Sequence, residues 1–208
     1  MTSSFPQLVL ASNSPARAEI LSQINLEFIT VPSDIDEDIP MDDPKAFVAK
    51  LSLKKAKTVL AMIKSNYEEV IILGFDTIVI DPKNQVIGKP TDRKNARKML
   101  ESLSDTSHSV LTGCAIINYP QNSIFQQVIS TEVLFRELEE QEIDFYLSQG
   151  EWRGKAGGYA IQGMGRLLIK EIKGDFYNIV GLPINWVWET LLKQFSLELL
   201  EVVKKPHY

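Results

Sequence analysis

With 208 residues, 44% hydrophobic and 24% charged, the chain has the composition of a globular protein and enough length for one large domain or two smaller lobes. The formal net charge of −5 argues against a wide basic surface for duplex nucleic acid, no apolar run is long enough for a transmembrane helix, and the first residues lack the features of a signal peptide. A single cysteine, Cys114, excludes an intramolecular disulfide framework and favours a reducing, cytoplasmic location.

Strand and helix patterns alternate through the first half of the chain. Residues 7–11 predict a short buried strand, and Ser14 and Pro15 then form a start signal for a helix that ends near Asn25. The next expected elements are a strand at 27–31, a helix at 44–65 capped by Asp43, a buried strand at 70–80, a hairpin strand within 86–90 and a helix at 91–103.

Paired strands replace this alternation in the second half. Two longer strands, 109–119 and 123–135, flank a short turn, and a helix at 139–149 ends at a glycine. Eight of the eleven glycines fall between residues 150 and 181, which indicates a site shaped by its backbone rather than regular structure. Pro183 begins a last helix. The order of these elements predicts an α/β fold with a mixed sheet.

Two charged side chains interrupt apolar faces. Lys55 falls at the centre of the apolar face of its helix, between Leu51 and Val59, either as a lysine that extends to solvent or as one that points into a cleft to bind an anion. Asp76 shares one face of its strand with apolar residues, and Gly74 leaves room beside it. A buried carboxylate needs a partner, so Asp76 is either a structural cap or a general base or metal ligand.

Arg17 stands in the first turn of its helix, where the helix dipole disfavours a cation by roughly 0.3–1 kcal/mol. Free N–H groups at this end of a helix attract anions, so a phosphate that bridges both would explain the position. The alternative is a surface arginine that pairs with Glu19 or with the acidic loop that follows.

Further candidates lie in loops. Lys89 sits at a strand end between a glycine and a proline. The acidic run at 34–38 either supplies a magnesium ligand or is a solvated loop. In the segment 150–165, glycines surround Lys155 and would allow close approach to a ligand, while Gln162 could donate to and accept from the edge of a base.

Taken in order, these motifs resemble the Maf family of nucleoside triphosphate pyrophosphatases. The motifs are LASNSPAR, SDIDE, Lys55, GFDT, IGKP, HSVLTG, GKAGGYAIQG and GDFYNIVGLP, and they run from about residue 8 to residue 190. Each motif alone is weak, but the ordered set is specific. The resemblance implies one domain over residues 1–208, with a central mixed β-sheet flanked by helices and two lobes around a nucleotide-binding cleft.

The resemblance also implies an activity and its partners. Members of the family hydrolyse a nucleoside triphosphate to the monophosphate and pyrophosphate with a divalent metal, Mg²⁺, Mn²⁺ or Co²⁺. No nucleic-acid duplex or membrane is expected as a partner, and a homodimer is common in the family. Asp76 matches the catalytic proton acceptor, and Glu37 and Asp76 match acidic positions near the metal. Substrate-contacting positions correspond to Ser12, Ser14, Arg17, Lys55, Lys89 and Lys155.

The resemblance also concerns the choice of nucleotide. Thr77 and Gln162 match positions linked to substrate choice and favour dTTP and UTP. Ala16 departs from the pattern, because members acting on these nucleotides carry an arginine there and members related to 7-methyl-GTP carry a bulky aromatic residue. The alternatives are a pyrophosphatase for 7-methyl-GTP or another modified nucleotide, or a non-catalytic nucleotide-binding inhibitor of septum formation.

Overall fold

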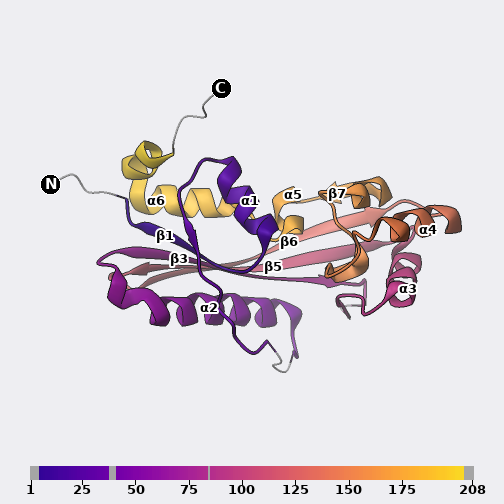
Figure 1. Cartoon of the computed structure of the whole chain (residues 1–208), viewed down its shortest axis with the longest axis horizontal. Helices are drawn as coiled ribbons and strands as arrows, with labels where there is room; N and C mark the ends of the chain where they lie inside the picture. Colours follow the sequence, from indigo (N-terminus) through magenta and orange to yellow (C-terminus); the bar gives the residue numbers. More distant parts are fainter. Residues whose placement is uncertain (1–4, 38–40, 84, 204–208) are drawn as a thin grey trace. The chain divides into compact units, whose positions relative to one another are not determined.

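The computed structural model describes residues 5–37, 41–83 and 85–203 (Figure 1). The chain divides into two compact units. Unit 1 consists of Met1–Asp76, Thr112–Ile129 and Gly181–Tyr208, and unit 2 consists of Thr77–Leu111 and Ser130–Val180. The boundary between Asp76 and Thr77 lies inside one strand.

Seven strands of the described chain form a single sheet in the order β2-β1-β3-β5-β6-β7, with β4 paired to β3. The β1 strand pairs in parallel with β2 and with β3, whereas the β3–β4 and β6–β7 pairs are antiparallel. The predicted α/β class with a mixed sheet and flanking helices is therefore confirmed. The strands are β1 (Gln7–Ala11), β2 (Ile29–Thr30), β3 (Val70–Ile80), β4 (Val86–Ile87), β5 (Ser107–Tyr119), β6 (Ser123–Phe135) and β7 (Ile169–Lys173).

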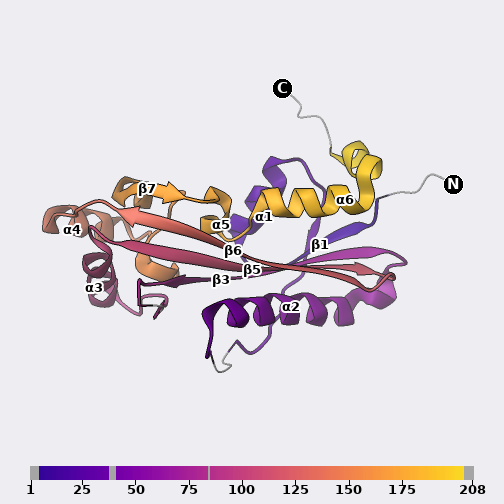
Figure 2. The same cartoon turned by 180° about the vertical axis from the view of Figure 1, so that it is seen from behind.

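Helices cover both faces of the sheet in unit 1. The α2 helix (Pro44–Ile63) lies along one face, and α1 (Pro15–Gln23) and α6 (Ile184–Val202) lie on the other (Figures 1 and 2). Asp43 caps α2, because its carboxylate accepts hydrogen bonds from the backbone N–H groups of Lys45 and Ala46 at 3.4 and 2.9 Å. The 3₁₀ helix η1 (Lys64–Asn66) follows α2.

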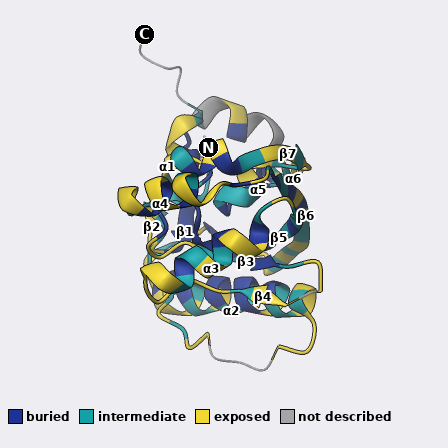
Figure 3. Ribbon diagram, turned by 90° about the vertical axis from the view of Figure 1, so that its right-hand side faces the viewer, coloured by how far each residue is buried: buried dark blue, intermediate teal, exposed yellow. Residues whose placement is uncertain are grey.

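One hydrophobic cluster of unit 1 lies between α2 and the sheet. Its buried residues include Val9, Val59, Ile72 and Ala115, each fully buried. In Figure 3 the strands β1 and β3 carry the colour of buried residues. The β3 strand, covered on both faces, is an almost continuous apolar run, as expected of a strand buried in this way.

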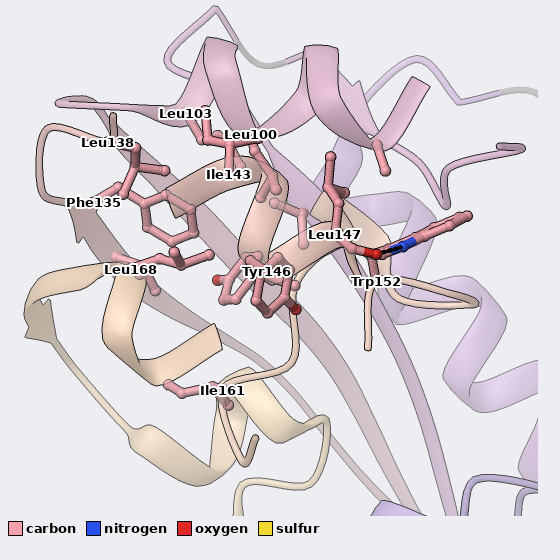
Figure 4. Packing of buried hydrophobic residues seen from close by; sticks show 14 of the residues in the cluster. Leu100, Leu103, Phe135, Leu138, Ile143, Tyr146, Leu147, Trp152, Ile161 and Leu168 are labelled. Carbon is pink, nitrogen blue, oxygen red and sulfur yellow. Dashed lines mark hydrogen bonds between the residues drawn. The ribbon is translucent and has the colours of Figure 1, made fainter. Parts of the chain in front are cut away.

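Unit 2 contains shorter elements around a second core. Its helices are α3 (Arg93–Leu103), α4 (Glu140–Gln149), η2 (Ala156–Gly158), η3 (Met164–Leu168) and α5 (Phe176–Val180). Phe135, Leu100 and Trp152 are among the residues that pack in its core (Figure 4). The Trp152 indole N–H donates to the carbonyl oxygen of Leu147 at 3.0 Å, so this buried polar group is satisfied.

The sequence-based boundaries agree closely with these elements. The strands at 7–11, 70–80 and 123–135 are found as predicted, and the expected helices at 44–65 and 139–149 differ by at most two residues at either end. The segment 150–181 contains more regular structure than the glycine pattern indicated, including β7 and α5. None of the helices within the described ranges is long and apolar enough to span a bilayer.

Candidate active site

Lys55 and Asp76 form a buried ion pair in unit 1. The Lys55 Nζ atom lies 2.6 Å from Asp76 Oδ1, and the two residues are 8% and 6% exposed. Lys55 therefore does not extend to solvent. The α2 helix directs it toward the sheet, and β3 presents Asp76 from the same face as Gly74. Each charge supplies the partner that the other needs to be buried.

A second carboxylate meets the same ammonium group. Glu37 Oε1 lies 2.7 Å from Lys55 Nζ, and the Glu37 side chain remains 58% exposed. The neighbouring residue on α2, Lys54, donates from Nζ to the carbonyl oxygen of Asp36 at 2.8 Å. Two consecutive lysines thus attach the acidic segment to α2. The predicted acidic residue Asp38 lies outside the described residues.

Arg17 connects the start of α1 with the segment before α6. Its Nε atom donates to the carbonyl oxygen of Gly181 at 2.8 Å, and its Nη1 atom donates to Ser12 Oγ at 3.1 Å. The hydroxyl of Ser12 also accepts from the Ser14 backbone N–H at 3.1 Å. Ser14 occupies the predicted N-cap position, but its side chain makes no capping hydrogen bond. No pattern in the sequence predicts the link to Gly181.

Burial sets the environment of this arginine. The guanidinium carbon lies 5.8 Å from the centre of the Phe75 ring, within the range of a cation–π contact. Burial lowers the pKa of Arg17 from its ordinary value, and the negative charges of Asp76 and Glu37 oppose that change. Ala16 precedes Arg17 in the first turn of α1 and is half-buried.

Lys89 and Lys155 belong to neighbouring segments of unit 2. Both residues are exposed. The Gly157 backbone N–H donates to the carbonyl oxygen of Gly88 at 3.1 Å, which joins the segment after β4 to the glycine-rich segment. Gly157 has φ of +74°, in the left-handed region where glycine is favoured. The backbone thus brings together two segments that each carry a candidate phosphate-binding lysine.

Gln162 lies on a turn of unit 2 that several hydrogen bonds hold in place. The Gln162 side chain is exposed, and the backbone carbonyl oxygen of Gln162 accepts from the Arg166 guanidinium. The backbone N–H of Ala160 donates to the Tyr146 hydroxyl at 3.0 Å, and that of Met164 donates to Glu151 Oε2 at 2.7 Å. Thr77, at the unit boundary in β3, is half-buried.

A buried histidine of unit 2 lies outside the predicted site. His108 Nε2 is 2.8 Å from the Tyr159 hydroxyl, and both rings pack edge-to-face against Phe135. Burial lowers the pKa of His108 to about 4. Its Nδ1 atom is buried without a hydrogen-bond partner among the described residues. His108 and Tyr159 are therefore core residues, and Tyr159 packs rather than stacking on a ligand.

The donor atoms of unit 1 fit a hard divalent cation. Glu37 and Asp76 each place a carboxylate oxygen within 2.7 Å of the Lys55 ammonium nitrogen, and Mg²⁺ prefers one or two carboxylates together with substrate phosphates. No cluster of three or more His, Cys, Asp or Glu side chains with metal-binding geometry occurs in the part of the chain that the structure describes.

Comparisons with known proteins find similarity over nearly the whole chain. The family model described as Maf-like protein matches residues 7–194. A dTTP/UTP pyrophosphatase of Thermoanaerobacter sp. (strain X514) is 40% identical over 93% of this chain and 100% of its own length, and a dTTP/UTP pyrophosphatase of Clostridium acetobutylicum is 43% identical over 89% and 96%.

A solved structure is also similar, though weakly. It is a nucleoside-triphosphatase, dITP/XTP pyrophosphatase, from Mycobacterium abscessus, with a TM-score of 0.46 and 13% identity over 92% of this chain and 99% of that one. The match to the family model and the identity with full-length relatives are sufficient by themselves, and they show that the chain belongs to the Maf family.

Proposed function

We propose that the protein is a nucleoside triphosphate pyrophosphatase that hydrolyses dTTP and UTP to the monophosphate and pyrophosphate. The observation that carries this proposal is the buried Lys55–Asp76 pair, in which a carboxylate is held at the Asp-Thr motif of a Maf-family chain. Relatives about 40% identical over nearly their whole length are named dTTP/UTP pyrophosphatases, which supports both the reaction and the nucleotides.

Asp76 acts as the general base in this proposal. Lys55 holds Oδ1 of the carboxylate, and Oδ2 accepts a proton from the attacking water. The water oxygen forms a bond to the α-phosphorus, the bond from this phosphorus to the bridging oxygen breaks, and pyrophosphate leaves with the bonding electrons. Lys55 and Arg17 are the cations of unit 1 that offset negative charge on the phosphates.

The start of α1 binds phosphate in this proposal. Ser12 and Ser14 provide hydroxyl groups at the amino end of the helix, where an anion is favoured. Arg17 is fixed by Gly181 and Ser12, so little side-chain freedom remains to be lost when a phosphate binds. In unit 2, Lys89 and Lys155 are the proposed substrate-binding lysines, and their exposure leaves them accessible to an anion.

Nucleotide choice is assigned to Thr77, Gln162 and the position of Ala16. The exposed Gln162 amide can donate and accept together, which suits the edge of a pyrimidine. Ala16 lacks the arginine that members acting on dTTP and UTP carry. House-cleaning of modified nucleotides by the same chemistry is therefore part of the proposal.

A divalent metal, Mg²⁺, Mn²⁺ or Co²⁺, is the proposed cofactor, with Glu37 and Asp76 as its protein ligands. When bound, it would neutralise phosphate charge and lower the pKa of water. Glu37 is the more exposed of the two carboxylates and is attached to α2 through Lys54 and Lys55. We also propose that the protein acts in the cytoplasm, where its nucleotide substrates are dissolved, and that it forms a homodimer.

A substrate panel tests the activity. The protein is incubated with dTTP, UTP, CTP and 7-methyl-GTP in the presence of Mg²⁺, and pyrophosphate release is measured. We expect release from dTTP and UTP, and loss of at least about 100-fold in kcat for Asp76→Asn at a temperature where the variant is folded. Asp81→Asn, in the turn after β3, is the matched control and should retain activity.

Two results would contradict the proposal. Near-normal turnover by Asp76→Asn would show that Asp76 is not the general base. Measurable nucleotide binding without pyrophosphate release at high protein concentration would favour the non-catalytic inhibitor of septum formation instead. Release from 7-methyl-GTP alone would keep the reaction and change the nucleotide.

A further inference from the structure

Two glycines bring α2 into backbone contact with the sheet of unit 1. A Cβ atom placed on Gly74 of β3 would lie less than 3.0 Å from the carbonyl oxygen of Ser52 and 2.9 Å from the Cβ atom of Ala56. A Cβ atom on Gly113 of β5 would lie less than 3.0 Å from the carbonyl group of Val48. Real Cβ atoms essentially never approach other atoms this closely, so any larger residue must displace its neighbour.

The neighbour at both glycines is the helix backbone. A flexible side chain could rotate away from an added methyl group, but the carbonyl groups of Val48 and Ser52 are fixed inside α2. These residues are four positions apart and therefore lie on the same face of the helix. The two contacts thus set the depth at which one face of α2 lies on β3 and β5, which are adjacent strands of the sheet.

The contact at Gly74 directly adjoins the proposed catalytic pair. Lys55 lies on α2 between Ser52 and Ala56, the two residues that meet Gly74. Asp76 follows Gly74 by two residues and points to the same face of β3. The separation between helix and strand at Gly74 therefore determines whether Lys55 Nζ reaches Asp76 Oδ1, now 2.6 Å away.

We infer that Gly74 and Gly113 are positioning residues for the hydrolysis, because their missing side chains fix the distance between α2 and the sheet at which Lys55 holds Asp76. The catalytic consequence rests on the proposed function, whereas the geometric part concerns the Lys55–Asp76 contact alone. Catalytic groups need positions accurate to about 0.5 Å, and a displacement of about 1 Å can cost roughly 100-fold in rate.

The test compares Gly74→Ala with Val59→Ala. Both variants destabilise unit 1, but Val59→Ala removes methyl groups from the core below α2 and does not force the helix outward. For Gly74→Ala we expect kcat to fall between about tenfold and 100-fold with KM nearly unchanged. Val59→Ala should keep kcat close to the wild-type value at a temperature where both variants are folded.

A second readout does not depend on activity. Acetic anhydride acetylates exposed lysines, and peptide mass spectrometry gives the rate at each position. In the wild-type protein we expect Lys55 to react much more slowly than exposed Lys57 on the same helix. In Gly74→Ala the rate at Lys55 should rise several-fold relative to Lys57, and in Val59→Ala this ratio should stay unchanged. Ala56→Ser, which adds one atom opposite Gly74, provides a milder displacement if Gly74→Ala does not fold.

The outcomes separate the inference from the function on which it rests. Unchanged Lys55 acetylation in the folded glycine or Ala56 variant would overturn the positioning role, as would equal loss of kcat in Val59→Ala at matched stability. Increased Lys55 acetylation, together with an inactive wild-type protein, would keep the geometric inference and reject the proposed hydrolysis.

Discussion

Lys55 Nζ and Asp76 Oδ1 lie 2.6 Å apart, and their side chains are only 10% and 8% exposed. Breaking a buried pair by removing one member leaves an uncompensated charge, which commonly costs about 3–5 kcal/mol. Replacing both members by apolar residues removes that penalty. The pair therefore predicts a stability pattern that is independent of any catalytic role.

We expect Lys55→Met to lower the free energy of unfolding by about 3–5 kcal/mol, because Asp76 would stay buried without its main partner. The double variant Lys55→Met/Asp76→Leu should recover most of this loss. Urea unfolding measures both values. Lys57→Met, an exposed position on the same helix, is the control and should change stability by less than about 0.5 kcal/mol. A double variant no more stable than Lys55→Met would argue against the pair.

Arg17→Ala should raise KM for the nucleotide by at least about tenfold, because the proposed phosphate site would lose a cation fixed by Ser12 and Gly181. Arg17→Lys should recover only part of the effect, since an ammonium group lacks the planar fork that bonds both partners. Steady-state kinetics provide the measurement. Arg93→Ala, an exposed arginine of α3, removes the same charge elsewhere and should leave KM unchanged. If Arg17→Ala and Arg93→Ala raised KM by the same factor, Arg17 would contribute only through its charge and not through a specific contact.

Ala16→Arg should raise kcat/KM for dTTP and UTP relative to 7-methyl-GTP, by an amount on the order of tenfold. The physical reason is an added donor at the amino end of α1, next to the proposed phosphate site. Competition between nucleotides measures the ratio directly. Ala18→Arg on the same helix, also half-buried, is the matched control and should leave the ratio unchanged. An unaltered ratio in Ala16→Arg would show that this position does not choose the nucleotide.

His108 predicts a pH dependence of stability. Its pKa is about 4 in the folded protein and about 6.5 when exposed, so the unfolded chain binds more protons between these values. Stability should therefore fall as the pH drops from about 6.5 toward about 4, by roughly 3 kcal/mol in total. Urea unfolding across this range provides the measurement.

His108→Gln removes the titration while its amide can still bond the Tyr159 hydroxyl. The stability of this variant should depend less on pH across the same window. The only other histidine in the sequence is His207, which lies outside the described residues. The variant His207→Gln is the matched control. An identical slope for His108→Gln and the wild-type protein would assign the pH dependence to other groups.

Local sequence signals predicted most of the fold. Asp43 and Pro44 marked the start of α2 correctly, because capping and proline geometry act within a few residues. The apolar run at residues 70–80 correctly predicted both ends of β3. The regular structure within residues 150–181 was not predicted. The β7 strand forms by pairing with β6, and this contact between residues far apart in the chain leaves no local pattern in the sequence.

The candidate site was predictable where a charge interrupted an apolar face. Lys55 and Asp76 were identified separately in this way, but nothing in either pattern showed that they contact each other. The link from Arg17 to Gly181 could not be predicted, because a backbone carbonyl acceptor leaves no trace in the residue type. Gly74 was expected to leave room beside Asp76, whereas in the structure α2 occupies that room.

The segment Gly74–Thr77 unites several constraints within four consecutive residues of one strand. Gly74 limits size, Asp76 supplies a charge that must be matched, and Thr77 is the first residue of the other unit. Gly74 and Asp76 each face residues of α2, so the side chains suited to these two positions of the strand depend on the helix packed against it.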